Sequence, residues 1–122
     1  MASPSTSHPE RTREISAALA PMRRSQSGTM QAFNQLAQSA LAAGVLSPKF
    51  KELLALALGV AAHCDGCIGF HAKALVGLGA TRAEIEETLA VAVYMGGGPS
   101  LMYSADALAA FEQFEKLAAT PA

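Results

Sequence analysis

Helix start and stop signals divide this chain into segments of helical length. Ser47 followed by Pro48 is typical of a helix start, and Thr81-Arg82-Ala83-Glu84 has the form of a capping box. Gly79 and the run Gly96-Gly97-Gly98 are stop signals. No segment shows the apolar–polar alternation of a half-buried strand. The sequence therefore predicts an all-α fold of five or six helices with short connections.

The expected domain covers residues 11–118, and residues 1–10, rich in Ser, Thr and Pro, are expected to be a disordered tail. Pro21 is expected to end the first helix. In the second helix, the predicted apolar stripe consists of Phe33, Leu36, Ala37, Ala40 and Leu41. The expected helices cover residues 11–19, 29–44, 48–62, 64 or 65 to 78, a segment opening at 81, and 99–117.

Composition excludes several functions. The 122 residues carry a net charge of −1, so nothing in the charge favours binding to nucleic acid or to an anionic membrane. Residues 1–14 contain no apolar signal segment, and the longest apolar run, Leu53–Ala62, is too short to cross a bilayer. A soluble cytoplasmic protein is expected. Because 51% of the residues are hydrophobic, we also expect apolar faces to be buried between subunits of a homo-oligomer.

The only two cysteines, Cys64 and Cys67, lie three residues apart, and His71 follows four residues later. On a helix these three side chains share one face. In a reducing compartment such a pair is typical of catalysis or metal binding rather than of a static cross-link. Two thiols at this spacing can close a disulfide reversibly, which makes redox chemistry the leading interpretation, with no bound cofactor or metal.

Glu52 becomes relevant if the chain reverses near residues 62–65. Two residues on the antiparallel helices then lie side by side when the mean of their residue numbers is close to the position of the reversal. The mean of 52 and 71 is close to that position. A hairpin would therefore place Glu52, His71 and Cys67 in sequence. An imidazole can accept a thiol proton, and a carboxylate can orient and stabilise the imidazolium.

Three other interpretations remain open. Zinc could be held by Cys64, Cys67 and His71 together with Glu52 or His63, in a structural oligomeric protein without redox turnover. The cysteines could also be ordinary small buried residues, or a lyase could use the pocket in which these side chains lie. Gly69 inside a helix costs about 1 kcal/mol relative to Ala, which predicts a close approach by another helix or by a substrate.

The pattern Glu52-x11-Cys64-x2-Cys67-x3-His71 resembles the alkyl hydroperoxidase D-like (AhpD-like) branch of the carboxymuconolactone decarboxylase superfamily, and the resemblance extends from about Phe33 to Phe114. It implies an all-helical protomer with a central antiparallel hairpin carrying the two cysteines. It also implies trimers or, for short members, hexamers built as trimers of dimers, of which we expect the hexamer.

The same resemblance implies hydroperoxidase or disulfide reductase activity, with a peroxide or disulfide substrate and an external thiol reductant. Cys67 would become a sulfenic acid, Cys64 would resolve it, and His71 and Glu52 would relay protons. Gly66 departs from the pattern, because peroxidase members often have a histidine there. The decarboxylase branch lacks the cysteine pair, so the resemblance disfavours lactone decarboxylation.

Overall fold

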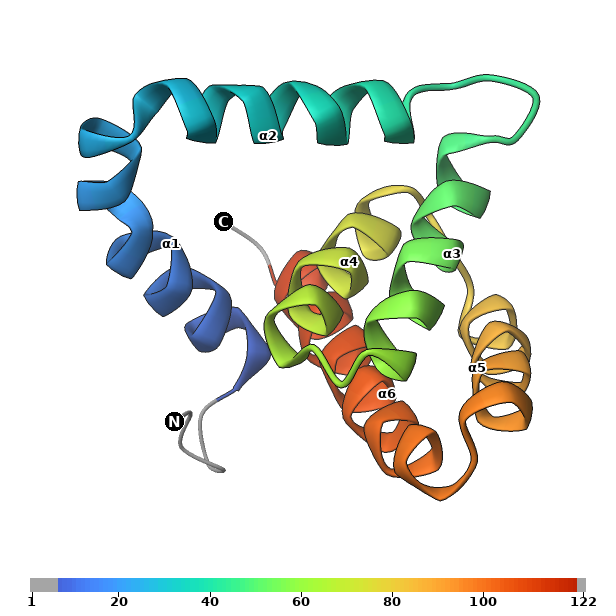
Figure 1. Ribbon diagram of the computed structural model, residues 1–122. Coiled ribbons are helices and arrows are strands. Elements are labelled where there is room, and N and C mark those ends of the chain that lie inside the picture. Colours follow the sequence, from blue (N-terminus) through green and yellow to red (C-terminus); the bar gives the residue numbers. More distant parts are fainter. Residues whose placement is uncertain (1–6, 121–122) are drawn as a thin grey trace.

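A computed structural model describes residues 7–120 of the chain, and this part is all-helical without a strand (Figure 1). The predicted all-α class and helix number are confirmed. The helices are α1 (His8–Ser25), α2 (Ser27–Leu41), α3 (Pro48–Ala61), α4 (Asp65–Gly77), α5 (Arg82–Gly96) and α6 (Gly98–Ala119). None of these helices is long and apolar enough to span a bilayer.

The core lies among α3, α4, α5 and α6, with α4 packed against both α3 and α6. Its largest apolar members are fully buried, and each helix contributes at least one side chain. Burying a side chain of this size contributes about 1.5–3 kcal/mol, so this cluster is the main source of stability. The core residues are Leu56, Val60, Ile68, Ala72, Leu75, Ala80, Ile85, Leu89, Ala92, Ala107, Ala110, Phe111 and Phe114.

The predicted helical hairpin is present. α3 begins at the Ser47 cap, whose side chain accepts a hydrogen bond from the Phe50 N–H at 3.1 Å, as the Ser-Pro signal predicts. The chain reverses at residues 62–64, and α4 returns alongside α3 (Figure 1). The predicted capping box also forms, because Thr81 and Glu84 each accept a hydrogen bond from the other's backbone N–H.

The N-terminal helix differs from the prediction. α1 begins at His8, so the last part of the expected tail is helical, and residues 1–6 lie outside the described part. Ser7 caps α1 by accepting from the Glu10 N–H at 3.3 Å. Pro21 does not end the helix, since α1 continues to Ser25. Pro21 removes one hydrogen bond, to the carbonyl of Ala17, and Ala17 is exposed so that water can replace the lost partner.

The apolar stripe predicted for α2 lies on an exposed helix in this protomer. α2 contacts only its sequence neighbours α1 and α3 among the described helices, and it runs across the top of Figure 1 away from α4–α6. None of its residues is buried, and Phe33 and Leu36 are 66% and 63% exposed. Within residues 7–120, α4, α5 and α6 do not pack against this stripe.

Candidate redox site

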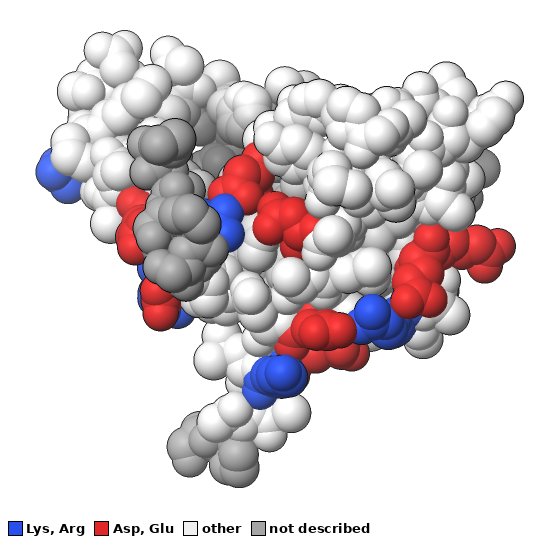
Figure 2. All heavy atoms as spheres, turned by 90° about the horizontal axis from the view of Figure 1, so that it is seen from below, with Lys and Arg blue, Asp and Glu red and all other residues white. Residues whose placement is uncertain are grey.

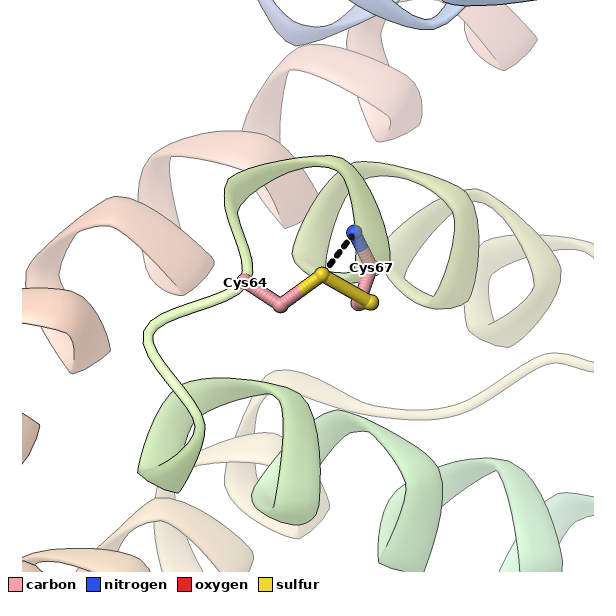
Figure 3. Close-up of a disulfide and its surroundings, with 2 residues drawn as sticks. All are labelled: Cys64 and Cys67. Carbon is pink, nitrogen blue, oxygen red and sulfur yellow. Dashed lines mark hydrogen bonds between the residues drawn. A yellow bond between two sulfur atoms is a disulfide. The ribbon is translucent and has the colours of Figure 1, made fainter.

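Cys64 links the end of α3 to the start of α4. Its backbone N–H donates to the Gly59 carbonyl at 2.9 Å, closing the last turn of α3. Its Sγ accepts a hydrogen bond from the Cys67 N–H at 3.2 Å, which makes Cys64 the N-cap of α4 (Figure 3). The sulfur is thus held at the positive end of a helix dipole, which favours a thiolate over a thiol.

Cys64 and Cys67 are joined by a disulfide, with 5.2 Å between their Cα atoms (Figure 3). Both residues are half-buried, so the disulfide is neither sealed in the core nor fully open to water. The structure therefore represents the oxidised state of the pair that the sequence singled out.

Glu52 and His71 meet across the hairpin, as the arithmetic predicted. His71 Nδ1 lies 2.6 Å from Glu52 Oε1, and Glu52 is only 9% exposed. Because Nδ1 faces the carboxylate, Nε2 is the ring nitrogen left for proton exchange. His71 follows Cys67 by four residues on α4, which places the carboxylate–imidazole pair one helical turn from the disulfide.

Glycines allow the surrounding helices to approach the site closely. A Cβ on Gly59 would lie 3.2 Å from Cys67 Cβ, so the α3 backbone lies directly against Cys67. A Cβ on Gly69 would lie 2.9 Å from Thr12 Cγ2 and 3.3 Å from His8 Nδ1. The predicted close approach at Gly69 is therefore confirmed, and the approaching element is α1. The role of Gly59 was missed, although a glycine within the apolar run 53–62 was the available signal.

A charged cluster joins α1 to the first turn of α4, and sequence reasoning missed it. His8 is buried, and its Nε2 lies 2.8 Å from Asp106 Oδ1. Arg11 forms an ion pair with Asp65, the residue after Cys64. Burial works to raise the pKa of Asp65, but hydrogen bonds with Arg11 and Asp106 hold it below its usual value. The available signal was Ser7-x-x-Glu10, a capping-box pattern that marks a helix start at His8.

The possible metal ligands that the structure gathers differ from the alternative zinc set. Among residues 7–120, the His, Cys, Asp and Glu side chains that gather closely enough for a shared metal are His8, Asp65 and Asp106, with ligand atoms within 4.8 Å of one another. In the same part of the chain, the alternative set of Cys64, Cys67 and His71 with Glu52 or His63 does not form such a group while the two cysteines are joined in the disulfide.

An apolar groove of about 470 Å³ lies between α3 and α5. It contains none of the four predicted site residues. Its lining residues are Phe50, Leu53, Leu54, Ala57, Glu84, Glu87, Thr88 and Val91.

Among the described residues, the face shown in Figure 2 has neither a large acidic patch nor a large basic patch. Small groups of acidic and basic residues lie among broad uncharged areas.

Comparison with known proteins identifies the family. The model of the carboxymuconolactone decarboxylase family matches residues 28–110. The chain is similar to a carboxymuconolactone decarboxylase family protein from Legionella pneumophila, solved in its apo form. That match has a TM-score of 0.87 and 54% identity, covering 88% of this chain and 96% of the other. A solved Thermotoga maritima protein matches with a TM-score of 0.75 and 29% identity, over 91% and 95% of the two chains.

An uncharacterized protein of Cupriavidus necator is 38% identical over 102 residues, which is 84% of this chain and 90% of the relative. A Paracoccus denitrificans protein, described as uncharacterized protein 4 in the cox locus, is 32% identical over 84% of this chain and 92% of its own length. The class of protein is therefore an all-helical one whose α3–α4 hairpin carries a cysteine pair. The chain belongs to the carboxymuconolactone decarboxylase family.

Proposed function

We propose that this protein is a thiol-dependent oxidoreductase of the AhpD-like branch, reducing hydroperoxides by cycling Cys64 and Cys67 between dithiol and disulfide. The observation that carries the proposal is the Glu52–His71 hydrogen bond, one helical turn from the disulfide. A structural disulfide has no need of a buried carboxylate holding an imidazole beside it. The combination is typical of an activated thiol.

In the proposed oxidation step, His71 accepts the Cys67 proton and Glu52 stabilises the resulting imidazolium. The Cys67 thiolate attacks the outer oxygen of ROOH, the O–O bond breaks, and the alkoxide takes a proton to leave as ROH. Cys67 is then a sulfenic acid. The Cys64 thiolate attacks its sulfur, hydroxide leaves with a proton as water, and the disulfide forms.

Two equivalents of an external thiol complete the cycle and leave as a disulfide. The overall balance is ROOH + 2 RSH → ROH + H₂O + RSSR. The cycle needs a supply of reduced thiol, so we place the protein in a reducing compartment such as the cytoplasm.

The test is peroxide consumption with dithiothreitol as reductant, using hydrogen peroxide and an organic hydroperoxide in parallel. Turnover should be lost in Cys67→Ser and retained in Lys73→Gln, a matched control on the exposed side of α4. Reduced protein that loses two thiols per peroxide consumed, with mass spectrometry showing the Cys64–Cys67 linkage, supports the proposal. Equal turnover in Cys67→Ser and the parent chain rejects it.

The family name keeps a lyase as the second candidate, because the matched family is described as a carboxymuconolactone decarboxylase family. A lyase acting at the hairpin site would not require sulfur chemistry. Its activity on a lactone acid should survive replacement of both cysteines, whereas the proposed peroxidase activity should not.

We further propose a homo-oligomer, with a hexamer favoured over a trimer. α3 exposes Phe50, Leu54 and Leu58 at four-residue intervals, which places them in one stripe along the helix. Leu58 is 69% exposed, and α2 adds its own exposed apolar face. An apolar surface of this extent is typical of a subunit interface. Light scattering should report a particle much larger than 12.6 kDa, and a monomer at micromolar concentration would reject the proposal.

A further inference from the structure

Two helices of this protein end in the same backbone motif, but with different residues at its critical position. At the end of α3, Ala62, His63 and Cys64 donate to the carbonyls of Leu58, Val60 and Gly59 at 2.9, 3.1 and 2.9 Å. At the end of α4, sixteen residues later, Leu78, Gly79 and Ala80 donate to Ala74, Val76 and Leu75 at 3.0, 3.1 and 3.0 Å. Both ends are Schellman motifs.

The residue in the left-handed conformation differs between the two motifs. Gly79, with φ of 76°, is the residue type that this position favours. His63 occupies the equivalent position with φ of 56°, and it is the non-glycine residue with positive φ in the described part of the chain. Histidine tolerates this conformation better than most residues, but glycine adopts it without a steric penalty. Forming the turn therefore does not explain the histidine.

The His63 imidazole is held in a defined place. Its ring stacks on Tyr103 of α6, with 4.8 Å between ring centroids and 6° between ring planes. His63 is exposed, and it directly precedes Cys64, the N-cap of α4. A strained residue with an oriented titratable side chain next to a reactive group is a common feature of functional sites.

We propose that the functional group of His63 is its imidazole, which exchanges protons with Cys64. The Glu52–His71 pair has the corresponding role for Cys67. The inference rests on the proposed dithiol–disulfide function. The protonated ring stabilises the Cys64 thiolate and supplies a proton to it when the disulfide opens. Each sulfur of the pair would then have its own histidine.

The proposed step belongs to the reductive half of the cycle. A reductant thiolate, RS⁻, attacks Cys67 Sγ and forms an RS–Cys67 mixed disulfide. The Cys64–Cys67 bond breaks, its electron pair goes to Cys64 Sγ, and the His63 imidazolium gives that sulfur a proton. A second thiolate then attacks the mixed disulfide, releasing RSSR and the Cys67 thiolate, while His63 regains a proton from water.

The charged side chain next to Cys64 in the sequence, Asp65, already has an ion-pair partner. Asp65 is paired with Arg11 of α1, so the negative charge beside Cys64 is offset. The His63 ring instead stacks on the aromatic ring of Tyr103 from α6. The titratable and charged groups on the elements packed here are His8 and Arg11 of α1, Asp65 of α4, and Tyr103 and Asp106 of α6. Glu52 and His71 pair further along the hairpin.

The test measures thiol alkylation by iodoacetamide against pH, in Cys67→Ser protein, where Cys64 is the single thiol. His63→Gly and His63→Asn should each raise the pH midpoint of Cys64 alkylation by about 0.5–1 unit, because a nearby positive charge is lost. His63→Gly also introduces the residue type that a positive φ angle favours. Its melting temperature should therefore change by less than about 4 °C.

The matched control places the same two substitutions in Cys64→Ser protein, where the alkylation midpoint of Cys67 should not move. A Cys64 midpoint unchanged in both folded variants, or equal shifts for Cys64 and Cys67, would overturn the proposal and reduce His63 to a helix cap. Alkylation requires no peroxide, so a protein inactive towards peroxides would reject the proposed function while leaving this measurement decisive for His63.

Discussion

Replacing Gly69 with alanine tests how closely α1 packs on the helix that carries the cysteines. The new Cβ would lie 2.9 Å from Thr12 Cγ2 and 3.3 Å from His8 Nδ1. Neither neighbour can turn away easily. Thr12 is buried, and its hydroxyl donates to the Pro9 carbonyl at 3.0 Å. The His8 ring lies 2.8 Å from Asp106 through Nε2, and the His8 backbone N–H donates to Gln113 Oε1 at 2.8 Å.

The expected magnitude follows from two opposing effects. Alanine in a helix interior is favoured over glycine by about 1 kcal/mol. Overpacking a tight contact costs about 1–3 kcal/mol, which here includes moving α1. Gly77, in the last turn of the same helix, has no atom within 4 Å of an added Cβ, so Gly77→Ala receives only the favourable effect. Gly69→Ala should thus be less stable than Gly77→Ala by about 1–3 kcal/mol.

The assay is thermal unfolding followed by circular dichroism on the two variants and the parent chain. For a chain of this length the difference corresponds to about 4–12 °C in melting temperature. Adding Thr12→Ser removes the contacting methyl group and should recover part of the loss, which a double-mutant cycle measures. If Gly69→Ala is as stable as Gly77→Ala, α1 does not pack against α4 as described.

Three further predictions address the site, its surroundings and assembly. Glu52→Gln replaces a charge-assisted hydrogen bond to His71 with a neutral one, a loss of about 1–1.5 kcal/mol or roughly tenfold. Because general acid–base groups contribute up to about 10⁴-fold, peroxide turnover should fall about 10–1,000-fold without loss of the oligomer. The pKa of Asp65 is lowered in the folded state, so its ionised carboxylate stabilises the fold fully above the usual pKa of 3.8, and this stabilisation is lost as the pH falls below that value. Arg11→Met removes the ion pair, so the free energy of unfolding should fall less steeply with decreasing pH than in the parent chain. Urea titrations from pH 5 to 2 measure this slope. Leu54→Asp should reduce the particle size in light scattering, and an unchanged size would exclude the α3 stripe from the interface.

The parts of the structure that follow local rules could be predicted from the sequence. The Ser47-Pro48 signal predicted the start of α3. The reversal near residues 62–65 was only assumed, but once it is granted, helical geometry places Glu52 level with His71, as the structure shows. A short turn largely fixes which residues of the two helices lie opposite each other, because few backbone angles separate the helices. The proximity of these two side chains is confirmed, and their catalytic roles remain predictions.

Long-range pairing could not be predicted in the same way. His8 and Asp106 are separated by 98 residues, and no periodicity in either segment specifies the other. The apolar stripe of α2 shows the same limit: periodicity identifies the stripe but does not reveal which surface, if any, covers it. His63 gave a weak signal, because only the backbone conformation shows that it stands where Gly79 stands in the next helix.

The most direct measurement of the central claim is sulfenic acid trapping in Cys64→Ser protein after one equivalent of peroxide, with mass spectrometry to locate the label. If Cys67 is the sulfur that the His71–Glu52 pair activates, the trap should label Cys67 once per chain, and Cys67→Ser protein should remain unlabelled. Labelling of Cys64 in Cys67→Ser, with none on Cys67 in Cys64→Ser, would reverse the roles of the two sulfurs. No label in either variant would contradict the account that this disulfide is formed by reaction with peroxide.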